Sequence, residues 1–208
     1  MVNEKSSFLL LLILVAIGMG VAVLLPTEET YAFHQGLDNH SRGGCDRDCT
    51  PPTLGVTVDG RIAVDNGFSY NGNAVDVKSY FTPMDLITVQ VGKENTAVLK
   101  IYEEQGPKYV EHVGLAFGLA KGESFGESKA VINIDKRLDG TYTVTTYDPE
   151  NALGDGRATQ TIENGLLIVT IYHTFRAPLD FNMVATNLWD YDRNAWHNYY
   201  NHGIQIQG

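Results

Sequence analysis

The sequence predicts an all-β protein, an antiparallel β-sandwich, and three observations lead to this prediction. Apolar residues after residue 53 alternate with polar ones at a period of two, which is typical of strands with one buried face. Turn signals that combine Gly with Asn or Asp recur between the alternating segments. No segment after residue 33 carries a sustained helical stripe. Many short strands joined by such turns favour a sandwich or barrel.

The alternation is clearest in segments rich in Val, Ile, Thr and Tyr, which are the residues that fit a pleated, half-buried surface. These segments are residues 86–91, 97–102, 132–135, 141–146 and 167–173. The turn signals between strands are Asp59-Gly60, Asn66-Gly67, Asn71-Gly72, Asp139-Gly140 and Asn164-Gly165. One short helical turn is expected near Ser124–Ala130.

The N-terminal region predicts export. Residues 8–25 are apolar and uncharged, Lys5 precedes them, and the small-residue motif Thr30-Tyr31-Ala32 follows. This pattern is typical of a signal peptide cleaved near Ala32. The alternative is a retained membrane anchor of near-minimal length. Both predict an extracellular or cell-envelope location. The expected organisation is a signal peptide or anchor helix at 1–32, a polar lead-in at 33–52 and a single β-sandwich domain at 53–208.

The lead-in contains both cysteines of the chain, Cys45 and Cys49. In an oxidising compartment they are expected to form a disulfide. The alternative is a metal site that combines them with His34 and His40, since thiolates and imidazoles are zinc ligands.

Charge and motifs exclude several classes of function. The formal net charge is −10, whereas a nucleic-acid-binding domain needs a basic surface to displace phosphate counterions. The motif His-Glu-x-x-His and a phosphate-binding loop are both absent from the sequence. We therefore expect neither a nucleic-acid partner nor an enzyme, with an enzyme of nonstandard site as the weakest alternative.

Two segments resemble the cupredoxin family. Residues 86–117 show strands around a Gly/Pro turn, and His112 stands where that family places its first copper-binding histidine. Residues 187–208, NLWDYDRNAWHNYYNHGIQIQG, resemble the family's last loop and final strand. The sequence departs from the family because no cysteine follows His112, and a blue-copper centre needs that thiolate. The resemblance therefore implies a cupredoxin/Ig-like sandwich without a blue-copper centre.

The chain also resembles a group of exported archaeal proteins. The resemblance rests on the Cys-x-x-x-Cys-Thr-Pro-Pro segment at 45–52 and on Trp189-Asp190-Tyr191. It implies an exported location and no particular activity.

Three histidines are candidate ligands for copper or zinc. His112, His197 and His202 would meet at one end of a cupredoxin-like sandwich, with Met183 as a weak axial donor. The alternative is that each histidine is an ordinary surface or capping residue.

The C-terminal part also contains a dense aromatic group, which comprises Trp189, Tyr191, Trp196, Tyr199 and Tyr200. Exposed, these rings could stack on a sugar or meet a protein partner; buried, they would secure the final strand in the core.

Two functions follow from these sites. The first is an exported, non-catalytic cupredoxin-like binding domain that holds copper or zinc through histidines. The second is a cell-envelope structural or interaction protein whose aromatic C-terminal edge meets an envelope protein or a glycan. In either case residues 8–25 could attach the chain to a membrane. The sequence predicts no oligomeric state.

Overall fold

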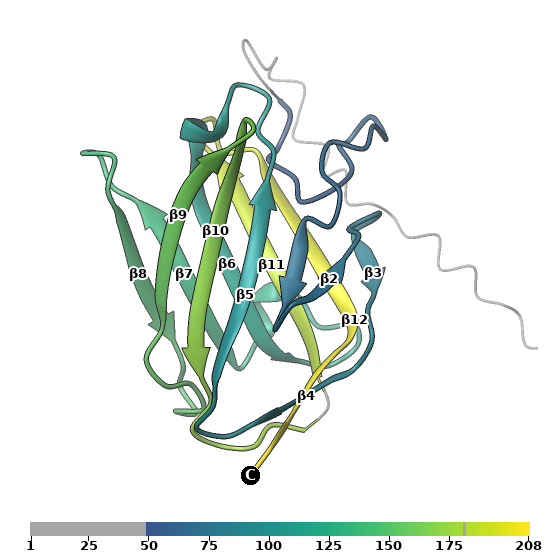
Figure 1. Ribbon diagram of the computed structural model, residues 1–208, viewed down its shortest axis with the longest axis vertical. Helices are drawn as coiled ribbons and strands as arrows, with labels where there is room; N and C mark the ends of the chain where they lie inside the picture. Colours follow the sequence, from purple (N-terminus) through teal and green to yellow (C-terminus); the bar gives the residue numbers. More distant parts are fainter. Residues whose placement is uncertain (1–48, 181) are drawn as a thin grey trace, which may run out of the picture. The chain divides into compact units, whose positions relative to one another are not determined.

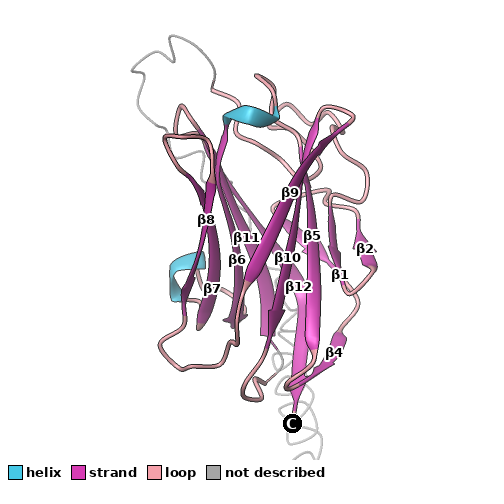
Figure 2. Cartoon of the chain, turned by 60° about the vertical axis from the view of Figure 1, so that its left-hand side comes forward, coloured by secondary structure: helices cyan, strands magenta, loops and turns pink. Residues whose placement is uncertain are grey.

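Strands account for nearly all regular structure in the computed structural model, which describes residues 49–180 and 182–208. The described residues form twelve strands. Figure 1 shows their arrangement and Figure 2 the two layers that they form. The strands are β1 (Phe68–Tyr70), β2 (Asn73–Val75), β3 (Phe81–Pro83), β4 (Ile87–Gln90), β5 (Glu94–Ile101), β6 (Val110–Leu119), β7 (Ala130–Lys136), β8 (Tyr142–Tyr147), β9 (Arg157–Glu163), β10 (Leu166–Thr174), β11 (Asn182–Asp190) and β12 (Ala195–Gln207). Two 3-10 helices join them, η1 (Pro107–Tyr109) and η2 (Phe125–Glu127).

The strands form two sheets, so the predicted all-β sandwich is confirmed. The first sheet has the order β2-β1-β5-β10-β9. The second has the order β3-β12-β11-β6-β7-β8, and β4 also pairs with β12. The prediction of a purely antiparallel sandwich is wrong in one respect, because β3 and β4 both run parallel to β12. A parallel pair needs a long connection between its strands, and residues 91–194 lie between β4 and β12.

The predicted period of two places alternate side chains of each sheet in a shared core. Leu99 and Ile101 of β5 and Leu115 of β6 are fully buried there. Phe68 of the first sheet stacks on Tyr200 of the second, with ring centroids 4.1 Å apart. The two layers are therefore held by apolar contacts across their facing surfaces.

Two of the predicted turns connect hairpins. Asn71 and Gly72 join β1 to β2, and Asn164 and Gly165 join β9 to β10. All four residues have positive φ, between 48° and 81°. This is the two-residue hairpin conformation that Asn-Gly favours, so these two turn predictions are confirmed.

The second sheet also has a covered outer face. A smaller apolar cluster lies there, made of Ala116, Leu119, Val131, Met183, Ala185 and Tyr199, with Tyr80, Phe81 and Phe125 packed against it. Helix η2 lies within the predicted helical segment 124–130 and begins with a capping box between Ser124 and Glu127. The Tyr199 hydroxyl accepts a hydrogen bond from the Phe125 amide at 2.8 Å, which fixes η2 against this face.

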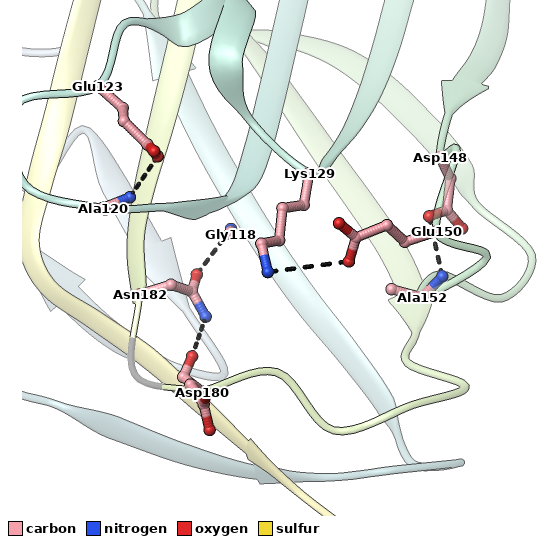
Figure 3. A network of polar contacts seen from close by, with 9 residues as sticks. All are labelled: Gly118, Ala120, Glu123, Lys129, Asp148, Glu150, Ala152, Asp180 and Asn182. Carbon is pink, nitrogen blue, oxygen red and sulfur yellow. Dashed lines mark hydrogen bonds and ion pairs between the residues drawn. The ribbon is translucent and has the colours of Figure 1, made fainter.

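Asn182 links the start of β11 to its neighbours (Figure 3). Its side-chain oxygen accepts from the Gly118 amide at 2.9 Å, and its amide donates to the Asp180 carbonyl at 2.8 Å. Gly118 lies at φ 78°, a conformation that glycine adopts without strain.

The N-terminal predictions fall on residues that the structure does not describe. The expected helix at 8–25, the cleavage site, His34, His40 and Cys45 of the expected disulfide all lie outside the described residues. Within the described part of the chain, no helix is long and apolar enough to span a membrane.

Candidate functional site

Three polar and aromatic residues lie in one row across the second sheet. His112 of β6 pairs with Trp189 of β11 on one side and with Asp135 of β7 on the other. Directly opposed residues of paired strands point to the same face of a sheet. Their chain neighbours Val113 and Ile134 are in the core, so this row lies on the outer face.

The three side chains contact one another closely. The His112 Nδ1 and Asp135 Oδ1 atoms are 2.7 Å apart. The imidazole of His112 is parallel to the indole of Trp189, at an interplanar angle of 3° and a centroid distance of 3.4 Å. His112 is only 3% exposed, whereas Trp189 is half-buried. We call Trp189, His112 and Asp135 the Trp189 platform.

A glycine makes room for the imidazole. A Cβ atom on Gly114 would lie 3.0 Å from His112 Nε2 and 3.0 Å from Cζ of Phe125. The imidazole and the Phe125 ring therefore share the space that a side chain would otherwise occupy. A side chain at position 114 would therefore displace the imidazole on which the indole of Trp189 is stacked.

Burial keeps the imidazole neutral. It lowers the pKa of His112, and the hydrogen bond to Asp135 opposes this only in part. A neutral imidazole beside a carboxylate donates its Nδ1 hydrogen, which leaves a lone pair on Nε2. His112 Nε2 and Asn187 Oδ1 are both buried without a hydrogen-bond partner among the described residues.

His197 lies on the same outer face as His112. It pairs with Asn187, which pairs in turn with Gly114. Its ring contacts Phe125 at a centroid distance of 5.6 Å. The pKa of His197 is lowered by burial and, to a lesser extent, by the nearby His112.

His202 lies elsewhere. It lines a groove of about 560 Å³ together with Asp76, Lys78 and Met84. It lies five positions after His197 on β12, at an irregularity in the pairing with β11 where His202 itself has a φ of 76°. The described residues contain no group of three or more His, Cys, Asp or Glu side chains that could hold a metal ion. Met183 is 2% exposed and packs in the outer apolar cluster.

The predicted aromatic group is divided between the two faces of the sheet. Alternation along β12 places Tyr199 on the outer face and Tyr200 in the core, and both are buried. Trp196 pairs with the core residue Leu188 and is half-buried. Tyr191 is 63% exposed beyond the end of β11. Of the five rings, Trp189 is the one stacked in a polar setting on the outer face.

Sequence reasoning found His112, His197 and Trp189 but missed Asp135, Gly114 and Phe125 as members of this site. The alternation of Ile132 and Ile134 with polar residues does indicate that Asp135 faces outward. The identity of the strand beside β7 depends on long-range pairing, which local periodicity does not encode.

Comparisons with known proteins give no family. No family model matches the chain, and no curated protein matches it. Among solved structures, a VGSC β subunit studied for cell-adhesive interactions is 9% identical, with a TM-score of 0.37, and the match covers 62% of this chain and 93% of that one.

Two further solved structures are similar in the same limited way. A family 9 carbohydrate-binding module from Caldicellulosiruptor kristjanssonii in complex with cellotriose is 8% identical, with a TM-score of 0.33, over 60% of this chain and 94% of that one. A cohesin module from a Clostridium perfringens glycoside hydrolase is 15% identical, with a TM-score of 0.26, over 68% and 99%. At these TM-scores the similarities carry no argument, and the strand pairing itself establishes the sandwich.

Proposed function

We propose that this protein is an exported, non-catalytic binding domain that presents the outer face of its second sheet, at the Trp189 platform, to a partner in the cell envelope. The parallel stack of Trp189 on His112 carries the proposal. Aromatic side chains held in place by their neighbours are typical centres of recognition surfaces, because little conformational entropy is lost on binding. The apolar segment at 8–25 supports export.

The arrangement of Asp135 and His112 suits binding better than catalysis. A carboxylate that orients an imidazole is part of a catalytic triad only when a nucleophile lies at the other ring nitrogen. Here Nε2 lies beside Gly114 and Phe125, and no described hydroxyl or thiol is hydrogen-bonded to it. The pair therefore supports the indole above it.

A second candidate function is copper or zinc binding at His112 and His197. One observation favours it: a carboxylate holds the Nδ1 atom of His112 and leaves Nε2 without a partner, which is how proteins commonly orient a metal-binding imidazole. Elemental analysis after copper and zinc loading tests it. About one equivalent of metal that is lost in both His112→Ala and His197→Ala would support this site.

The binding proposal is tested by retention of the purified protein on cell-envelope fractions of the organism that produces it. The Trp189→Ala variant is expected to lose most retention, by about tenfold or more. Ile162→Ala is the matched control, because Ile162 is an exposed apolar residue of β9 in the other sheet. Equal retention of the wild-type protein and Trp189→Ala, with both folded by circular dichroism, would contradict the proposal.

A further inference from the structure

One face of the Trp189 indole is stacked on the imidazole of His112, which is the sole ring contact that Trp189 makes in the described part of the chain. The residue is half-buried, so part of the indole remains accessible to solvent. The face of an aromatic ring carries partial negative charge and attracts polarised C–H groups, such as those on the apolar face of a sugar ring.

Short polar side chains continue the outer face beside this ring. Asp135 pairs with Thr143 of β8, and Asn133 pairs with Thr145. The Asp135 side chain is 48% exposed although one of its oxygens bonds to His112, and Thr145 is exposed. A carboxylate, an amide and hydroxyls together can accept and donate hydrogen bonds, which matches the mixed requirements of sugar hydroxyls.

The charge of the protein narrows the class of ligand. With a formal net charge of −10, the protein repels polyanions such as sulfated glycans. Arg137 lies at the edge of this surface. Its Nε atom donates a hydrogen bond to the Thr143 hydroxyl at 2.5 Å, so this donor is used within the protein. The side chains that continue this face on β7 and β8 are Asp135, Asn133, Thr143 and Thr145, which suit the hydroxyls of a sugar better than an apolar protein hot spot.

We infer that the Trp189 platform binds a neutral saccharide, with one sugar ring stacked on the indole face opposite His112 and its hydroxyls bonded to Asp135, Asn133 and Thr145. This inference rests on the proposed binding function and specifies its ligand class. The hydrogen bond from His112 to Asp135 fixes the platform before the ligand arrives, which lowers the entropic cost of stacking.

The test is a titration of the 15N-labelled protein with neutral oligosaccharides of glucose, mannose, galactose, xylose and N-acetylglucosamine. The indole N–H signal of Trp189 reports on the site, and that of Trp196 serves as an internal reference. We expect one of these sugars to shift the Trp189 signal saturably. Trp189→Ala should weaken binding by about tenfold or more and Thr145→Val by a smaller factor, while Trp196→Phe should bind as the wild-type protein does. Trp189→Tyr keeps a ring in place and should retain part of the affinity.

The contrary outcomes separate this inference from the proposed function. If no neutral sugar shifts the Trp189 signal while envelope retention still depends on Trp189, the saccharide assignment is overturned and a protein partner replaces it. If neither sugar binding nor retention depends on Trp189, both proposals fail. Equal or tighter binding of a sulfated polysaccharide would overturn the neutral ligand class.

Discussion

Gly114 matters at the outer face because it has no side chain, which leaves room for the rings of His112 and Phe125. The nearest atoms to a Cβ atom at this position are His112 Nε2 and Phe125 Cζ, both at 3.0 Å, which is closer than ordinary van der Waals contact. The imidazole cannot move far, because Asp135 holds its Nδ1 atom and Trp189 is stacked on it. A larger residue at 114 must therefore displace the support of the indole.

We expect Gly114→Val to lower the free energy of unfolding by about 1–3 kcal/mol, the usual cost of inserting methyl groups into a packed site. It should also change the fluorescence of Trp189, because the indole loses its stacked partner. Urea unfolding and emission spectra measure both effects. Gly126→Ala is the matched control, since a Cβ there would meet nothing within 4 Å. Unchanged stability and emission in Gly114→Val would contradict the geometry described above.

A second buried histidine lies in the core between the sheets. His173 is 1% exposed, and its Nε2 lies 2.8 Å from the hydroxyl of Tyr70. Phe117 and Phe175 surround the ring. Burial lowers the pKa of His173 to about 3, well below its ordinary value of 6.5. The unfolded state therefore binds a proton between these values that the folded state excludes.

Stability should consequently fall as the pH falls from about 6.5 toward 3, by up to about 1.4 kcal/mol per pH unit for this one group. Urea unfolding at a series of pH values measures the slope. His173→Gln is expected to make the slope shallower, because glutamine does not titrate. Thr161→His adds an exposed histidine on β9 and serves as control, with the wild-type slope expected. An equally steep slope in His173→Gln would show that other groups dominate.

At the level of elements, β8 is an edge strand without the usual protection. Its six residues, YTVTTY, contain no charge and no proline, and among the described strands it pairs only with β7. Edge strands are commonly protected from pairing with other chains by charges, prolines or bulges. One edge strand of the other sheet, β9, carries Arg157 and Glu163. These two edge strands thus differ in their tendency to recruit a further strand.

We expect Tyr147→Lys, which places a charge on β8, to slow aggregation during mild heating more than Ile162→Lys does on β9. Both residues are exposed and apolar, at 57% and 62%, so the pair controls for the loss of hydrophobic surface. Light scattering at fixed temperature measures the difference. Equal effects of the two substitutions would mean that exposed apolar area, rather than the unprotected edge, determines aggregation.

The alternation of apolar and polar residues predicts some strands well and others poorly, and the difference depends on how many faces of the strand are buried. Strand β10 was expected at 167–173 and spans Leu166–Thr174, because one of its faces meets the core and the other meets solvent. Only the end of β12 was expected from its alternation. Apolar residues on its outer face, such as Tyr199, pack under Phe81 and Phe125, so both faces are buried and the alternation is lost. The candidate site was predicted in part because His112 and Trp189 are conspicuous residues, whereas Asp135 and Gly114 join it only through strand pairing.

At the scale of the whole molecule, residues 53–55, which precede the first strand, belong to the folded unit. Leu54 is fully buried in the core. Thr53 and Tyr102 exchange two backbone hydrogen bonds of 2.9 Å. Gly55 lies so close to Val77 that a Cβ atom would stand 1.7 Å from its carbonyl oxygen. These contacts begin at residue 53, where the sequence predicts that the β-sandwich domain starts.

We therefore expect a chain that begins at residue 49 to unfold cooperatively, with a midpoint close to that of the longer chain. A chain that begins at residue 58 should be destabilised by at least about 2–5 kcal/mol, the cost of losing a buried leucine alone. Leu54→Ala in the 49–208 chain should reproduce much of that loss. Thermal unfolding measures all three, and equal midpoints would place the domain start later in the chain.

The position of β12 has a consequence for when the protein can fold. Residues 195–207 form an interior strand that joins β11 to β3 and β4, so the second sheet is divided until they are present. Their pairing with residues 81–90 makes the contact order high and the closure of the sheet slow. A nascent chain therefore cannot complete its second sheet until residues 195–207 have left the ribosome, so one backbone edge of β11 stays unpaired while the preceding residues are synthesised.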